Sequence, residues 1–69
     1  MVKVGDKYKE RMPFGEKRFF SWEYEVVGFT TESYGEFAKC IRKYRGGKEE
    51  PVSISIELLT ETAFYKKVA

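Results

Sequence analysis

The chain has 69 residues, with 13 Lys or Arg, 11 Asp or Glu, a formal net charge of +2 and 17% aromatic residues. A chain of this length has room for one domain, residues 1–69, and for no buried catalytic cleft of ordinary size. Its near balance of charge does not by itself indicate a polyanionic partner.

The N-terminal segment, residues 2–11, is predicted to form a strand. The side chains expected on its apolar face are Val2, Val4 and Tyr8. The Gly5-Asp6 dipeptide indicates a turn or bulge within this strand. A loop is expected at residues 12–17, which contain Pro and Gly.

Residues 18–29 carry the clearest pattern in the chain. From residue 20 to residue 26, large apolar side chains alternate with Ser and Glu, which is typical of a strand with one buried and one solvated face. The side chains expected on the buried face are Phe20, Trp22, Tyr24 and Val26. Trp22 is predicted to lie at the centre of the core. Gly28 predicts a bulge or bend, because the apolar positions shift there from even to odd numbers.

The segment 33–45 fits two structures. A helix is indicated by a capping-box pair at its start and by an apolar stripe. The residues of that stripe are Phe37, Cys40, Ile41 and Tyr44. As a strand, the segment would turn Ala38 and Cys40 inward, and residues 44–48 would form a hairpin loop. The strand is the favoured interpretation, and the helix remains the alternative.

The C-terminal third predicts two short strands around one helical turn. Residues 51–56 alternate again, and Pro51 fits the start of a strand, where its missing N–H is tolerated. A helical turn is expected at residues 57–59, and a closing strand at residues 63–68. The whole chain is therefore predicted to be mostly β, with four or five antiparallel strands and one short helical turn near the C-terminus. A helix at 33–45 would instead make the fold α+β.

Four stretches in order resemble the SH3-like small β-barrel. They are Val-Gly-Asp-x-Tyr (4–8), Trp-x-Tyr-x-Val (22–26), Ala-Lys-Cys (38–40) and Val-Ser-Ile-x-Ile-Glu-Leu-Leu (52–59). The resemblance is to short barrel proteins of phages and mobile elements. It rests on packing residues, so it implies a fold more directly than a function. The first strand also resembles the small archaeal chromatin barrels, from which no binding residue is carried over.

The residue types present exclude several kinds of chemistry. The chain has no His, which is the commonest general base and metal ligand. The single Cys40 cannot complete an internal disulfide or a Cys-rich zinc site, and its apolar neighbours predict an inert core residue. We therefore expect no enzyme activity, no catalytic residue, no metal and no cofactor.

The sequence also indicates where the protein works. It shows no apolar signal-peptide region and no apolar stretch of about 20 residues, so we expect no membrane association. One unpaired Cys is typical of a reducing compartment, and we expect a cytoplasmic protein. Many Lys and Glu residues without any Asn, Gln or His are typical of thermophilic proteins.

Two sets of side chains are candidate binding residues. More aromatic residues fall at predicted loops and strand ends than so small a core needs, and these predict a surface for a protein partner. They are Phe14, Phe19, Tyr34 and Tyr44. Cations around one predicted hairpin predict contacts to a phosphate backbone. They are Arg42, Lys43, Arg45 and Lys48.

The favoured function is a non-enzymatic interaction module that binds a protein partner, as an accessory protein of a phage or mobile element. The alternative is a nucleic-acid-binding small β-barrel that uses the basic hairpin, with Tyr44 as a stacking residue. Binding to DNA that weakens steeply as salt rises would distinguish the alternative from the favoured function.

Overall fold

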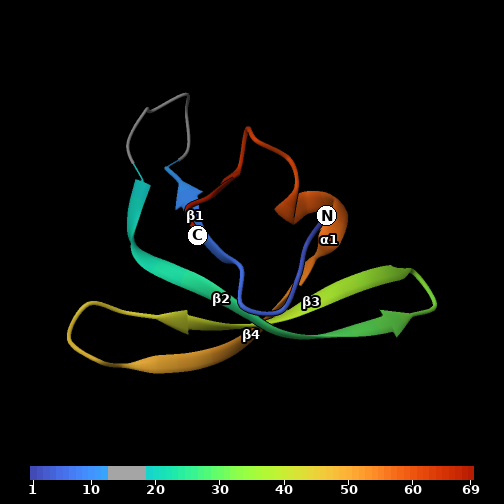
Figure 1. The fold of residues 1–69 in the computed structure, drawn as a ribbon, viewed down its shortest axis with the longest axis horizontal. Coiled ribbons are helices and arrows are strands. Elements are labelled where there is room, and N and C mark those ends of the chain that lie inside the picture. Colours follow the sequence, from blue (N-terminus) through green and yellow to red (C-terminus); the bar gives the residue numbers. More distant parts are fainter. Residues whose placement is uncertain (13–18) are drawn as a thin grey trace.

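A computed structural model gives the fold, and it describes residues 1–12 and 19–69. Five antiparallel strands form one sheet in the spatial order β4-β3-β2-β1-β5 (Figure 1). The elements are β1 (Lys7–Arg11), β2 (Phe19–Glu32), β3 (Gly35–Lys43), β4 (Glu49–Ser55), α1 (Ile56–Leu59) and β5 (Tyr65–Lys67). The predicted fold class, mostly β with one short helical turn near the C-terminus, is confirmed.

The connections explain how a small sheet encloses a core. Strands β1 to β4 follow one another as antiparallel neighbours, and α1 then leads from the edge strand β4 to β5. Strand β5 pairs with β1 at the other edge of the sheet. The chain therefore folds back over one face, which we call the inner face, and α1 contributes Leu59 to the core there.

The segment 33–45 is a strand, and the helical alternative is wrong. Strand β3 pairs with β2 on one side and with β4 on the other, so both of its edges are used. Gly46 and Gly47 have φ values of 100° and 95°, which a hairpin loop accommodates because glycine adopts positive φ freely. The Tyr44 N–H closes this loop by donating to the Lys48 carbonyl oxygen at 2.8 Å. Strand pairing on both sides outweighs a helical spacing of a few apolar residues.

The bulge predicted at Gly28 is confirmed. The register between β2 and β3 shifts between Val26 and Gly28, so Val27 is the additional residue. Val26 is fully buried, whereas Val27 is exposed on the opposite face. After the bulge, Phe29 pairs with Ala38, so Phe29 lies on the inner face although its number is odd.

The predicted N-terminal strand is too long, because β1 begins at Lys7. Residues before it form a turn in which the Lys3 N–H donates to the Asp6 carboxylate at 2.9 Å. This hydrogen bond is the main reason that the pKa of Asp6 lies below its usual value. Val4 is 63% exposed, contrary to the prediction, because the turn directs it away from the core. Val2 is buried as expected.

The centre of the core differs from the prediction in one respect. The largest fully buried side chains are Tyr24, Leu59, Val26 and Cys40. Trp22 is partly buried and packs against this cluster from the side, so the predicted central position of Trp22 is wrong. Cys40 is buried, as predicted, and burial raises the pKa of its thiol to about 11. A thiol with so high a pKa is a poor nucleophile at neutral pH.

Candidate functional site

The predicted binding residues fall into separate parts of the molecule. Phe14 and the side chain of Phe19 lie outside the described residues. Tyr34 lies in the β2–β3 turn and Tyr44 in the β3–β4 turn, at opposite ends of the long axis of the molecule (Figure 1). The nine residues of β3 lie between the two tyrosines, a distance of about 30 Å in an extended chain. Tyr34 and Tyr44 therefore do not form one aromatic patch, and each end must be considered separately.

At the β3–β4 end, Arg42 lies among three aromatic rings on the inner face. Its guanidinium carbon is 5.3 Å from the ring centroid of Tyr24, 5.6 Å from that of Trp22 and 5.9 Å from that of Tyr44. One guanidinium nitrogen donates to the Tyr44 hydroxyl at 2.9 Å and to the Glu50 carboxylate at 3.3 Å. These contacts raise the pKa of Arg42, chiefly through the hydrogen bond to Tyr44.

A second carboxylate completes this group. Glu10 accepts a hydrogen bond from the Trp22 indole N–H at 3.1 Å and another from the Tyr24 hydroxyl at 2.8 Å. Burial, together with the hydrogen bond to Glu10, raises the pKa of Tyr24. Phe20 stacks on Trp22 with ring centroids 4.3 Å apart and planes 8° from parallel. We call these residues the arginine cluster: Glu10, Phe20, Trp22, Tyr24, Arg42, Tyr44 and Glu50.

Sequence reasoning missed Glu10 and Trp22 as members of the arginine cluster. One signal was available, because Glu10 has the same parity as Tyr8 and must share the apolar face of β1. A carboxylate on that face needs hydrogen-bond donors, and Trp22 and Tyr24 supply them. Their identity depends on the β1–β2 register, which a single sequence does not reveal.

The four cations of the predicted basic hairpin are not equivalent. Arg42 lies on the inner face, whereas Lys43 lies on the outer face and forms an ion pair with Glu25. The hydrogen bond between them raises the pKa of Lys43 and lowers that of Glu25. Arg45 and Lys48 are exposed in the loop, and the Lys48 ammonium is 5.5 Å from the Tyr44 ring centroid. The structure thus brings Arg42, Tyr44 and Lys48 together but leaves Lys43 on the other side of the sheet.

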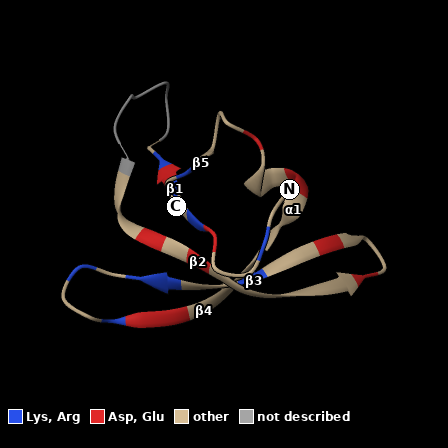
Figure 2. Cartoon of the chain, viewed as in Figure 1, with Lys and Arg blue, Asp and Glu red and all other residues tan. Residues whose placement is uncertain are grey.

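The outer face carries charges of both signs. One row of cross-strand partners runs through all five strands: Lys66, Lys9, Glu23, Lys43 and Glu49. Basic and acidic stretches accordingly lie beside each other on β3 and β4 (Figure 2). From Lys9 to Glu49 the charges alternate in sign, which favours pairing within the sheet and weakens the attraction for a polyanion, whereas Lys66 and Lys9 are opposed like charges.

The β2–β3 end has a different surface. Tyr34 is 78% exposed, and its ring packs edge-on against Phe37 with centroids 5.4 Å apart. The cross-strand partner of Phe37 is Ser55, which lines a groove of about 270 Å³ beside α1 together with Leu58 and Phe64. Leu58 is 42% exposed and Phe64 is 51% exposed. Exposed apolar side chains therefore lie both at the hairpin tip and in the groove beside α1, and the Phe37–Ser55 pairing connects the two places.

All charged residues in the two segments that build this surface are acidic. Residues 26–38 and 53–65 together contain four Glu and no Lys or Arg. Figure 2 shows the acidic positions on the β2–β3 hairpin and along α1 and the segment after it. We call this region the α1 surface: Glu32, Tyr34, Glu36, Phe37, Glu57, Leu58, Glu61 and Phe64.

Three further findings bear on function. Within residues 1–12 and 19–69, no group of three or more acidic, His or Cys side chains is placed to hold a metal ion. In that same part of the chain, no helix has the length and apolar character needed to cross a membrane. Comparison of the chain with known protein families, characterised proteins and solved structures finds no match. Any functional proposal therefore depends on the geometry of the site.

Proposed function

We propose that this protein is a non-enzymatic docking module that binds a protein partner through the α1 surface. The observation that carries this proposal is the exposure of Tyr34, Leu58 and Phe64 within one acidic region. Solvent-exposed apolar side chains that gather at one place, rather than scattering singly, are typical of partner sites. Tyrosine also ranks among the residues that contribute most to binding energy in interfaces.

The chemistry of the surface indicates the chemistry of the partner. The carboxylates around these apolar side chains attract Lys and Arg and repel phosphate groups. The partner segment is therefore a peptide that combines basic residues with apolar side chains. Its apolar residues would cover Leu58 and Phe64 in the groove, and its cations would face Glu57 and Glu61.

The arginine cluster supports a structural role better than a docking role. Arg42 already has Tyr44 and Glu50 as hydrogen-bond partners. Glu10 is engaged by two donors of the same cluster. These contacts satisfy most polar groups at the end of the core, although the buried Arg42 Nε has no hydrogen-bond partner among the described residues. The apolar side chains of the α1 surface, by contrast, remain available to a partner. For the same reason the nucleic-acid alternative has weaker support, because Arg42 and Lys43 both form ion pairs within the fold.

A titration with two short synthetic peptides tests the proposal. One peptide alternates Lys with Leu and Phe, and its matched control carries Glu at every Lys position. We expect the Lys peptide to shift the amide resonances of Tyr34, Leu58 and Phe64 in NMR spectra and to bind more weakly as salt rises. Equal binding of the Glu peptide, or shifts confined to the arginine cluster, would contradict the proposal.

Substitutions sharpen the same experiment. Leu58→Ser and Phe64→Ser are each expected to weaken binding of the Lys peptide at least fivefold, which is about 1 kcal/mol or more. Val4→Ser is the matched control, because Val4 is an exposed apolar residue that lies outside the α1 surface. An equal loss of affinity in the Val4 variant would show that peptide binding is unspecific.

A further inference from the structure

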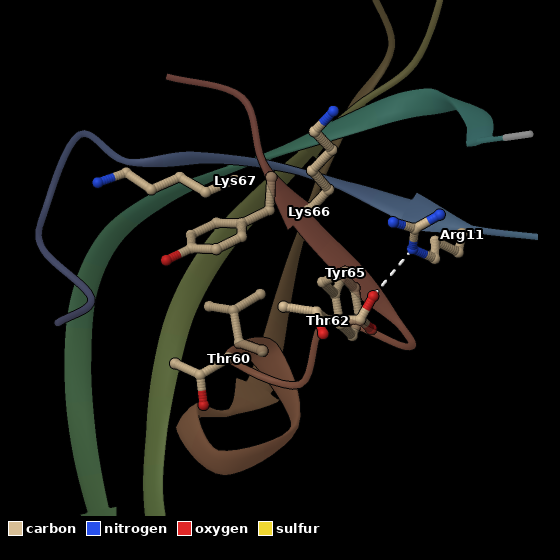
Figure 3. Close-up of a pocket in the computed structure, with 8 residues that line it drawn as sticks. Arg11, Thr60, Thr62, Tyr65, Lys66 and Lys67 are labelled. Carbon is tan, nitrogen blue, oxygen red and sulfur yellow. Dashed lines mark hydrogen bonds between the residues drawn. The ribbon is translucent and has the colours of Figure 1, made fainter. Parts of the chain in front are cut away.

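The two edges of the described sheet differ in how open they are to another chain. Strand β5 has three residues, two of them lysines, and short edges that carry lysine resist pairing with a further strand. The segment before β5 is also held to β1, because the Arg11 Nε–H donates to the Thr62 carbonyl oxygen at 2.9 Å (Figure 3). Strand β4 has seven residues, and within the described sheet its only neighbour is β3. The β4 edge is therefore the longer and more open one.

The backbone groups of β4 alternate between facing β3 and facing away from it. The Tyr44 N–H donates to the Lys48 carbonyl oxygen, and the β3–β4 register continues regularly from there, so the even-numbered residues of β4 bond with β3. The odd-numbered residues turn their N–H and C=O groups away from β3: Glu49, Pro51, Ser53 and Ser55. Pro51 fits this pattern, because a residue that faces away from the neighbouring strand contributes no N–H to the ladder.

Two grooves border this free edge. One has a volume of about 390 Å³ and lies on the outer face, where Val27, Ile41, Pro51 and Ser53 contribute to its lining. The other is the groove of the α1 surface, to which Ser55 contributes. A strand laid along β4 would carry every second side chain on the outer face, beside Pro51, Ser53 and Ser55. Its side chains could therefore enter both grooves.

Carboxylates lie at both ends of the edge. Glu49 is at the start of β4, and its cross-strand partner Lys43 already forms an ion pair with Glu25. Beyond the end of β4, Glu57 and Glu61 line the groove of the α1 surface. A segment with cations at its two ends would find an opposite charge at each end of the edge.

The same charges disfavour a second copy of this chain as the occupant. A two-fold axis would pair two β4 edges in antiparallel fashion, with the start of each strand beside the end of the other. Glu49 of each copy would then lie near Glu57 of the other copy, and like charges brought together across strands are destabilising.

One cation lies on the same face but points away from the edge. Lys39 is the cross-strand partner of Ser53. A Cβ atom placed on Gly28 would lie 3.9 Å from Lys39 Cδ, so the Lys39 side chain extends over β2. Its charge therefore does not oppose a cationic segment at β4.

We propose that the partner segment binds as an added strand along β4, with apolar side chains in the two grooves and cations at both ends. Backbone hydrogen bonds to Pro51, Ser53 and Ser55 would hold the segment, and the grooves would select its side chains. This inference rests on the proposed function, because the second groove belongs to the α1 surface, and it adds that the bound segment is extended.

Backbone N-methylation of the Lys peptide tests the added strand. One peptide is methylated at the N atoms of its Leu and Phe residues, and its matched control at those of its Lys residues. In an added strand the N–H groups of alternate residues face β4 and the others face solvent. One methylated peptide should therefore bind about tenfold more weakly than the parent, and the other within about threefold of it. A loss with the Leu and Phe form indicates an antiparallel strand, and a loss with the Lys form a parallel one. Equal effects of the two methylations would overturn the proposal.

A variant of the protein tests the same contact from the other side. Ser53→Pro removes an N–H that faces away from β3, so the variant should keep the wild-type circular dichroism spectrum. It should bind the Lys peptide about three- to tenfold more weakly, because one backbone hydrogen bond is lost. Ser53→Ala is the matched control, since it keeps the N–H and should bind the peptide as the wild-type protein does. Should Ser53→Pro fail to fold, the methylated peptides still decide the question.

The outcomes separate this proposal from the docking proposal. Lys-peptide binding that requires Leu58 and Phe64 but is unaffected by Ser53→Pro and by methylation would overturn the added strand and leave the docking proposal intact. Absence of Lys-peptide binding would contradict both. Sedimentation equilibrium of the protein alone should show a monomer. A dimer that Ser53→Pro dissociates would assign the β4 edge to a second copy and overturn the proposal.

Discussion

Aromatic and charged residues lie at both ends of β3, but they have different roles at the two ends. At the β3–β4 end, aromatic rings surround Arg42, and the polar atoms of these rings are hydrogen-bonded to Glu10 or to Arg42 itself. At the β2–β3 end, Tyr34 has an aromatic neighbour but is mostly exposed, and the nearby carboxylates lie on the surface. Aromatic enrichment in a small protein therefore does not by itself identify a binding surface. The hydrogen-bond partners of each aromatic residue show whether it completes the core or belongs to a docking site.

The largest effect expected from this comparison concerns one aromatic residue from each end. Trp22→Ala should lower the free energy of unfolding by about 3 kcal/mol, the lower part of the range for core aromatics, because Trp22 is only partly buried. Tyr34→Ala should change the free energy of unfolding by less than about 0.5 kcal/mol, because its side chain is mostly in water. Urea unfolding followed by circular dichroism measures both. Equal losses would show that the two ends do not differ in the way described.

The next effect concerns the carboxylate in the arginine cluster. Glu10→Ala removes the acceptor of the Trp22 indole N–H and the Tyr24 hydroxyl, and it should cost about 1–3 kcal/mol of unfolding free energy. Glu36→Ala, an exposed carboxylate of the β2–β3 hairpin, is the control and should cost less than about 0.5 kcal/mol. Retained stability in the Glu10 variant would contradict a structural role for the cluster.

The sequence predicted which face of a strand is buried better than it predicted which strands pair with each other. Alternation from residue 20 to residue 26 places Tyr24 and Val26 correctly on the buried face, and Gly28 marks the bulge. The helix-or-strand question at 33–45 could not be decided locally, because the same apolar residues satisfy both periods and pairing with β2 and β4 decides between them.

The candidate site was less predictable than the fold, because it depends on register. Arg42 and Glu50 become neighbours through the pairing of β3 with β4, and Arg42 and Tyr24 through the pairing of β3 with β2. A sequence indicates that Arg42 lies in a basic stretch, but only the cross-strand partners show that its charge is balanced. The separation of Tyr34 from Tyr44 likewise follows from the length of the extended strand between them.

A smaller effect is expected on the pH dependence of stability. The pKa of Asp6 lies below its usual value of 3.8 in the folded protein, first because of the Lys3 hydrogen bond and also because of Lys67. The stability that Asp6 contributes is therefore fully present above that value and is lost as pH falls through the lower folded pKa. Asp6→Asn should flatten the acid limb of a plot of unfolding midpoint against pH. An unchanged acid limb would show that the turn before β1 does not depend on the ionised carboxylate.

The smallest effect is expected for the exposed cations of the β3–β4 loop, and it tests whether this end binds nucleic acid. Arg42 is unsuitable for that test, because replacing it would disturb its contacts with Trp22, Tyr24 and Tyr44. Arg45 and Lys48 are exposed, so replacing both by Ala should change the unfolding free energy by less than about 0.5 kcal/mol.

Under the docking proposal, the wild-type protein has little affinity for single-stranded DNA even at low salt, and replacing Arg45 and Lys48 by Ala changes nothing. If this end instead binds phosphate backbones, the wild-type protein binds DNA with a steep salt dependence. The double replacement then reduces the slope of log K against log salt by about one to two units, because each cation neutralises about one phosphate. Fluorescence anisotropy across a salt series measures that slope. A steep slope that the double replacement flattens would give the β3–β4 end a function of its own, alongside the α1 surface at the other end of β3.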